Sequence, residues 1–319
     1  MLRTLFIYLS GAGWAQRLVR NWKFAQKMAA RFVAGETLDE AVEVIRQLND
    51  QGFNVTLDHL GENVTNREGA LAAREEVLQI MERIDREKLR SGVSVKLSQI
   101  GLVLDEEFCL DNLHEILTNA QALGLYVRID MEDSSLTEKT LRCYYRCLEA
   151  GFGETVGIVI QTYLYRSEED IQRILSESGT VRLCKGAYKE PASVAFPRKK
   201  DVDDNFDQLA RNLLDKAAET DREISRDGIH PPIPALATHD EERIRLASAY
   251  AERIHLPKHK MEFQMLFGIR FDLQKRLVAE GYPVRIYVPY GEEWYPYFTR
   301  RLAERPANLW FFISNYLKG

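Results

Sequence analysis

Short apolar segments rich in β-branched residues alternate with amphipathic helical patterns along most of this 319-residue chain. Between the segments, apolar residues recur at intervals of three and four, as on one face of a helix. Seven segments are evident: FNVTL (53–57), VSVKL (93–97), LYVRI (125–129), VGIVI (156–160), VRLC (181–184), IPALA (233–237) and VRIYV (284–288). Strands that alternate with helices predict βαβ units and a parallel sheet.

An eighth segment is expected between residues 237 and 284. The candidates are ERIHL (252–256) and MEFQML (261–266), and we favour the second. The helical patterns span residues 70–84, 109–123, 137–150, 168–178 and 206–220. Eight units in about 265 residues suit a closed (β/α)8 barrel as well as a doubly wound sheet. No linker interrupts residues 1–319, so one domain is expected, with residues 1–50 as a helical preface and a long connection at 186–232.

Charge and cysteine content limit the partners and the compartment. The formal net charge is −5, and nucleic acid is not expected as a partner because phosphate binding needs a basic surface. The four cysteines lack a framework spacing and no signal peptide is visible, which predicts a cytoplasmic protein. His255 and His259 are spaced like metal ligands, but Pro257 between them spoils a shared helical face, so no metal site is expected.

Polar residues close almost every predicted strand. In a parallel barrel, active sites lie at the carboxyl ends of the strands. The residues there are Asp58, His59, Lys96, Asp130, Gln161, Lys185, Thr238, His239, Gln264 and Tyr287. Polarity also resumes at strand ends in barrels without a site. However, Lys96 and Arg182 lie inside their segments, where a charge is costly unless it is paired or used.

The last predicted helix places two adjacent arginines on one face. In EEWYPYFTRRLAE (292–304), the residues at i, i+3, i+4 and i+7 are Tyr297, Arg300, Arg301 and Glu304. Two neighbouring guanidinium groups repel each other and gain from a shared carboxylate, which they can bind bidentately. The same spacing fits a solvated face with an Arg300–Glu304 ion pair. Spacing alone leaves both interpretations open.

Eight segments carry a resemblance to a known family: SVKLS (94–98), RIDMEDS (128–134), IQTYLYR (160–166), VRLCKGAY (181–188), ATHD (237–240), EFQMLFG (262–268), RIYVPYG (285–291) and YFTRRLAE (297–304). With these segments, the chain resembles the proline dehydrogenase family from about residue 40 to 316. The resemblance implies a distorted (β/α)8 TIM barrel with a helix over its mouth. It also implies FAD-dependent oxidation of L-proline to 1-pyrroline-5-carboxylate, with hydride transfer to flavin N5 and electrons passed to quinone.

The resemblance also implies roles for individual residues. Residues expected to bind the substrate are Lys96, Leu266, Tyr287, Tyr297, Arg300, Arg301 and Glu304. Asp130 and Arg182 are expected to be catalytic. Residues expected to contact FAD are Met131, Gln161, Arg182, Lys185, Gly186, Ala187, Tyr188, Thr238 and His239.

Reduction of quinone implies peripheral contact with the inner face of the cell membrane. Residues 14–33 are basic and carry aromatic side chains, so they are the candidate segment for that contact. An ordinary packing helix is the favoured interpretation of the same pattern.

Two other functions remain open at the level of the sequence. Lys96 and Lys185 both close strands, as the lysine of a Schiff-base barrel enzyme would. Alternatively, a barrel without catalytic activity could bind an amino acid as a sensor.

Overall fold

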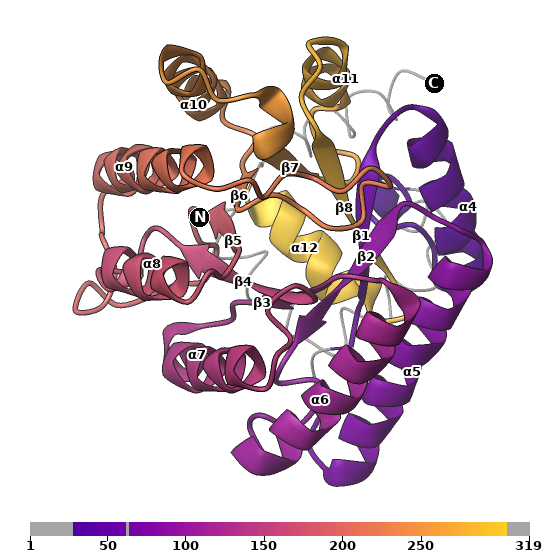
Figure 1. Ribbon diagram of the computed structural model, residues 1–319. Helices are drawn as coiled ribbons and strands as arrows, with labels where there is room; N and C mark the ends of the chain where they lie inside the picture. Colours follow the sequence, from indigo (N-terminus) through magenta and orange to yellow (C-terminus); the bar gives the residue numbers. More distant parts are fainter. Residues whose placement is uncertain (1–27, 62–63, 305–319) are drawn as a thin grey trace.

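Eight parallel strands close into a barrel in the computed structural model (Figure 1). The structure describes residues 28–61 and 64–304, with the backbone alone at positions 300 and 302–304. The strands are β1 (Asn54–His59), β2 (Ser91–Lys96), β3 (Val127–Asp130), β4 (Val156–Gln161), β5 (Val181–Cys184), β6 (Pro234–Ala237), β7 (Glu262–Leu266) and β8 (Val284–Tyr290). β8 pairs with β1, which closes the barrel and excludes the doubly wound alternative.

Every predicted strand is confirmed to within two residues at either end. MEFQML (261–266) forms β7, as favoured, whereas the alternative candidate ERIHL begins in the last turn of α10 (Glu241–Arg253). A helix C-terminus and a short strand both look like a brief apolar run, so periodicity alone does not separate them.

Helices surround the barrel (Figure 1). They are α4 (Leu38–Asp50), α5 (Arg67–Arg86), α6 (Glu106–Leu123), α7 (Ser134–Glu149), α8 (Ser167–Ser176), α9 (Lys199–Ala218), α10, α11 (Phe271–Ala279) and α12 (Trp294–Glu304), with a 3-10 turn at Lys258–Lys260. Several begin earlier than their apolar periodicity suggests. Asn66, Asp105 and Asp133 each accept a backbone hydrogen bond as an N-cap, and the polar turn that follows carries no periodic signal.

The strands have an apolar outer side and a polar inner side. In β1, Val55 and Leu57 belong to the main apolar core, whereas Asp58 is buried and polar. Side chains alternate along a strand, so a barrel of this kind keeps its apolar core between the strands and the helices. Here the lumen, meaning the space enclosed by the strands, is filled largely by polar side chains.

α12 crosses the ring of strands in Figure 1, where it is drawn in yellow. Its residues Trp294, Tyr295, Tyr297 and Phe298 are buried, and they form one apolar cluster with the segment 28–33 and with residues near the carboxyl ends of β1 and β7. Trp294 donates a hydrogen bond of 2.8 Å from Nε1 to Oε1 of Glu36. The predicted helix over the barrel mouth is therefore confirmed.

The preface is described only from residue 28 onward. α4 and the segment 28–33 confirm its helical character in part, while residues 1–27 lie outside the described residues. Met28, Ala29, Phe32 and Val33 are buried against α12, so this part of the candidate membrane segment packs inside the protein. Within the described residues, no helix combines the length and the apolarity needed to cross a bilayer.

Candidate active site

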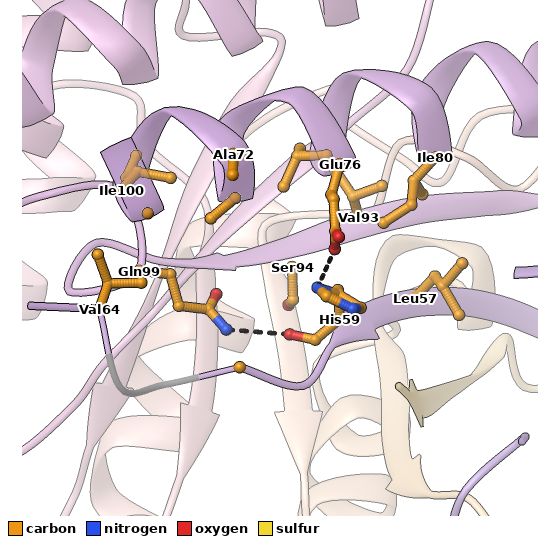
Figure 2. A pocket seen from close by; sticks show the side chains of 14 residues that line it. Leu57, His59, Val64, Ala72, Glu76, Ile80, Val93, Ser94, Gln99 and Ile100 are labelled. Carbon is orange, nitrogen blue, oxygen red and sulfur yellow. Dashed lines mark hydrogen bonds and ion pairs between the residues drawn. The ribbon is translucent and has the colours of Figure 1, made fainter. Parts of the chain in front are cut away.

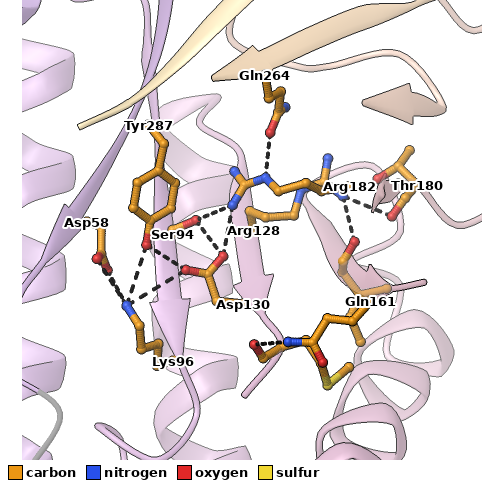
Figure 3. A network of polar contacts seen from close by, with 12 residues as sticks. Asp58, Ser94, Lys96, Arg128, Asp130, Gln161, Thr180, Arg182, Gln264 and Tyr287 are labelled. Carbon is orange, nitrogen blue, oxygen red and sulfur yellow. Dashed lines mark hydrogen bonds and ion pairs between the residues drawn. The ribbon is translucent and has the colours of Figure 1, made fainter. Parts of the chain in front are cut away.

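A network of buried charges crosses the lumen at its carboxyl end (Figure 3). Lys96 Nζ lies 2.9 and 3.0 Å from the two carboxylate oxygens of Asp58 and 3.8 Å from Oδ2 of Asp130. Tyr287 donates a hydrogen bond of 2.7 Å to the same Oδ2 of Asp130. These residues come from β1, β2, β3 and β8, and the contact between β3 and β8 spans the lumen because those strands are not neighbours.

Arg182 joins this network from the opposite wall. Its Nη1 donates to Oδ1 of Asp130 at 2.8 Å and to Oγ of Ser94 at 3.1 Å. Its Nε donates to Oε1 of Gln264, and its guanidinium carbon lies 5.4 Å from the centre of the Tyr287 ring. Asp130 is therefore the shared acceptor between Arg182 on one side and Tyr287 and Lys96 on the other.

Burial shifts the pKa of two groups in the network, Tyr287 and Asp58. It holds the pKa of the Tyr287 hydroxyl well above its usual range, so this group stays protonated and donates to Asp130. It also raises the pKa of Asp58, an effect that the nearby Lys96 ammonium opposes. Desolvation disfavours the charged form in both cases.

The buried charges on the strands carry a net positive excess. Lys96, Arg128, Arg182 and Arg285 face three carboxylates, Asp58, Asp130 and Glu262. Arg128 donates to the carbonyl oxygens of Ile158 and Thr180 at 3.1 and 3.0 Å, and burial lowers its pKa only to about 10, so it remains a cation. A buried positive excess favours the binding of an anion.

Gln161 and Met131 lie together at the carboxyl ends of β3 and β4. Gln161 Nε2 donates to the carbonyl oxygen of Met131 at 3.2 Å. Its Oε1 is buried and has no hydrogen-bond partner among the described residues. Such an orphaned acceptor is costly unless a ligand or water donates to it. The position fits a group with an N–H donor.

Two further residues expected to contact FAD, Thr238 and His239, lie beside β7. Nε2 of His239 accepts a hydrogen bond of 2.9 Å from the backbone N–H of Leu266. Thr238 is buried, and its backbone N–H donates to the carbonyl oxygen of Gln264 at 3.1 Å. His239 thus contacts Leu266, a predicted substrate residue, whereas Thr238 contacts the backbone of Gln264 in β7.

Lys185 is held by carboxylates from two helices. Its Nζ contacts Oδ1 of Asp203 in α9 at 2.5 Å and Oδ2 of Asp240, the N-cap of α10, at 2.7 Å. Gly186 follows with φ +102°, a conformation suited to glycine, and a Cβ there would lie 2.5 Å from the Tyr163 ring. Ala187 and Tyr188 are exposed. This motif thus presents an exposed, tightly bent backbone beside β5.

Only part of the predicted arginine face is described. Tyr297 is buried, and the guanidinium carbon of Arg301 lies 5.1 Å from the centre of its ring. Leu266 packs against the same apolar cluster, which brings α12 and β7 together. Arg300 and Glu304 lie in α12, but their side chains fall outside the described residues. The expected Arg300–Glu304 pair stays a prediction.

The network also contains three residues for which the sequence analysis predicts no role: Ser94, Asp58 and Gln264. Asp58 and Gln264 did appear among the strand-end residues. Ser94 lies two positions before Lys96, and this alternation places both side chains on the lumen side. The signal for Ser94 was therefore present in the register of β2.

His59 faces away from the lumen, unlike its neighbour Asp58. Its Nδ1 lies 2.6 Å from Oε2 of Glu76 in α5 (Figure 2). Both side chains line a cavity of about 190 Å³ between α5 and the outer side of β1 and β2. Although it closes β1, His59 does not join the network.

The described residues contain no cluster of His, Cys, Asp or Glu arranged to hold a metal ion.

Comparison with known proteins identifies the family. Residues 41–313 match the sequence profile of proline dehydrogenase. The chain is 40% identical over 316 residues to proline dehydrogenase 2 of Bacillus subtilis (strain 168), covering 99% of both chains. It is 38% identical to the proline dehydrogenase of Deinococcus radiodurans, covering 92% of this chain and 91% of that protein.

A solved structure with the same fold gives further evidence for the family. The crystal structure of proline utilization A from Bdellovibrio bacteriovorus, inactivated by N-propargylglycine, superposes with a TM-score of 0.78 at 26% identity. The match covers 87% of this chain but only 32% of that longer protein. Together with the full-length relatives, it shows that the chain belongs to the proline dehydrogenase family.

Proposed function

We propose that this protein oxidises L-proline to 1-pyrroline-5-carboxylate, with FAD as cofactor and quinone as electron acceptor. Family membership supports proline oxidation. The observation that carries the proposal is the network in which Asp130 links Arg182 to Tyr287 and Lys96 beneath α12. It provides a buried, preorganised site of paired charges at the barrel end where catalysis is expected.

The chemistry requires a cofactor, since side chains offer no acceptor for an electron pair. When bound, FAD would supply that acceptor: its N5 would take hydride from the ring carbon next to the proline nitrogen, the nitrogen would lose a proton, and quinone would receive the electrons. Gln161 would hold it through the orphaned Oε1. The other proposed contacts come from Met131, Arg182, Lys185, Gly186, Ala187, Tyr188, Thr238 and His239.

The protein side chains bind and orient the substrate. Arg301, with Arg300, would bind the proline carboxylate from α12, and Lys96 would assist from β2. Tyr287 and Leu266 would contact the pyrrolidine ring. Tyr297 and Glu304 would complete the pocket. In this arrangement Asp130 and Arg182 are the proposed catalytic residues, and α12 keeps water from the lumen.

The pairing of both candidate lysines argues against Schiff-base chemistry. A lysine that attacks a carbonyl must be neutral. Lys96 is paired with Asp58, and Lys185 with Asp203 and Asp240, so either amine would have to break an ion pair before it could attack a carbonyl. If the protein were an amino-acid sensor, the amino acid would bind in the same pocket without being oxidised. The experiment below separates such a sensor from an enzyme.

We further propose that residues 1–319 act as one domain in the cytoplasm, with peripheral contact at the inner face of the membrane. The reaction supports the contact, because a quinone acceptor resides in the lipid phase.

The visible spectrum of the purified protein tests the proposal. A flavin absorbs in the visible range, and L-proline should bleach that absorption in the absence of oxygen. D-proline serves as the matched control, because it has the same carboxylate and ring as L-proline but the opposite stereochemistry. A colourless protein that FAD does not restore, or a spectrum that L-proline leaves unchanged, would refute the enzyme; binding of proline without bleaching would support the sensor.

A further inference from the structure

Gln264 lies between two groups of opposite charge in the lumen (Figure 3 shows its contact with Arg182). Its Oε1 accepts from Nε of Arg182, and its Nε2 donates to Oε1 of Glu262 at 2.6 Å. All three side chains are buried. The amide thus separates the guanidinium group of Arg182 from the carboxylate of Glu262.

The chemistry of the two neighbours fixes the orientation of this amide. A guanidinium group can only donate and an ionised carboxylate can only accept, so the oxygen must face Arg182 and the nitrogen must face Glu262. Rotating the amide by half a turn would oppose two donors on one side and two acceptors on the other. Gln264 therefore has one stable orientation.

Glu262 is itself held in place from β8. Nε and Nη2 of Arg285 donate to its two carboxylate oxygens at 2.9 and 3.0 Å. Arg285 is anchored in turn by the carbonyl oxygens of Val55 and Gly228 at 2.9 and 2.7 Å. The rigid backbone of the barrel thus fixes Glu262, and Glu262 fixes the amide of Gln264.

The consequence for Arg182 is both geometric and electrostatic. Its Nε is held by Gln264 and its Nη1 by Asp130, so the plane of the guanidinium group is set from both sides. Asp130 is the one carboxylate paired with Arg182 among the described residues. A second carboxylate in place of the amide would offset more of its positive charge.

We propose that Gln264 is a positioning residue for the reaction: it orients Arg182 while keeping the carboxylate of Glu262 out of contact with it. The proposal rests on the proposed function, in which Arg182 is a catalytic residue. With FAD bound, its cation would favour the reduced, negatively charged flavin. A neutral amide is suited to this position because it transmits orientation without adding charge.

Two variants separate orientation from charge. Gln264→Met removes both hydrogen bonds at similar volume, whereas Gln264→Glu keeps an acceptor for Arg182 but places a second carboxylate beside Glu262. Gln208→Met, at an exposed site in α9, is the matched control. Purified holoenzymes are compared by kcat and KM for L-proline, by the midpoint potential of the bound flavin, and by melting temperature across pH.

Gln264→Met should lower kcat roughly 10- to 100-fold, the range expected when a hydrogen bond to a buried charged group is lost, while KM changes much less. Gln264→Glu should recover part of kcat and shift the flavin potential to more negative values. Wild-type kcat in Gln264→Met, or a wild-type potential in Gln264→Glu, would overturn the proposal. If the methionine variant does not fold, the potential of the glutamate variant decides.

The melting temperature gives a measurement that needs no catalysis. Two carboxyls in contact cannot both ionise freely, so one of them should hold a proton in Gln264→Glu. The carboxyl introduced at position 264 would lie beside Glu262 and Arg182. Arg285, Asp130 and Arg128 are the charged groups around these two residues. The variant should therefore lose stability relative to wild type as pH rises. A stability difference that does not change with pH would overturn the arrangement of Gln264, whatever the activity. If L-proline fails to reduce the flavin of the wild type, the proposed function fails and the role of Gln264 in the reaction fails with it, while the pH dependence still tests the arrangement.

Discussion

Tyr287 and Asp130 are joined across the lumen by a hydrogen bond of 2.7 Å from the tyrosine hydroxyl to Oδ2. The two residues lie on β8 and β3, far apart around the barrel. Because the opposite oxygen of Asp130 accepts from Arg182, this contact closes a bridge between the two walls of the site. The position of one carboxylate thus depends on both walls.

Removing the tyrosine hydroxyl tests this bridge. Tyr287→Phe removes the hydroxyl that donates to Oδ2 of Asp130, and leaving this buried carboxylate oxygen without its donor costs about 1–3 kcal/mol. We expect kcat/KM for L-proline to fall roughly 10- to 100-fold, since 1.4 kcal/mol corresponds to a factor of ten. Tyr250→Phe in α10, whose hydroxyl contacts Asp215 away from the site, is the control. Equal kinetics in both variants would contradict a role for the bridge.

The arginine on α12 should determine substrate affinity. Arg301→Ala removes a cation that would face the proline carboxylate, and losing one partner of a buried charge pair costs about 3 kcal/mol. KM for L-proline should therefore rise on the order of 100-fold. Arg245→Ala, at an exposed ion pair with Glu242, should have no effect. A normal KM in the Arg301 variant would count against a carboxylate clamp.

Gln161 should contribute to binding of the cofactor. A ligand that binds the folded state raises the melting temperature, so FAD should stabilise protein from which the flavin has been removed. Gln161→Met loses the orphaned acceptor and should show a smaller increase at the same FAD concentration. Gln208→Met again provides the comparison. The assignment fails if both variants gain as much as wild type.

The carboxylates around Lys185 should make stability depend on pH. Burial would raise the pKa of Asp203, but hydrogen bonds from Lys185 and Lys199 outweigh it and hold this pKa below the ordinary value of 3.8. A depressed pKa contributes stability above that value, and this contribution is lost as pH falls through the folded-state pKa. The deficit in melting temperature of Asp203→Asn should therefore be largest near neutral pH and shrink below 3.8. A deficit independent of pH would disagree with the ion pairs.

The fold was largely predictable because alternation and periodicity are local properties. Each strand, and the helices that follow β1 to β5 and β8, could be placed from neighbouring residues, and the charges inside the β2 and β5 segments pointed to Lys96 and Arg182. The helices that follow β6 and β7 were not among the predicted patterns. What stayed hidden depends on contacts between distant segments. Lys185 gives no sign of its partner Asp240, which lies 55 residues later. His59 faces α5 simply because it alternates with Asp58, so parity along β1 would have excluded it.

We propose above that the site beneath α12 binds L-proline and that FAD, held at the same site, oxidises it. The most direct measurement is an anaerobic single-turnover reaction of the holoenzyme with L-proline, followed by mass analysis of the small molecule released. We expect a product that lacks two hydrogen atoms relative to proline, in an amount equal to that of the bleached flavin. Recovery of unchanged proline, or bleaching without that product, would contradict it.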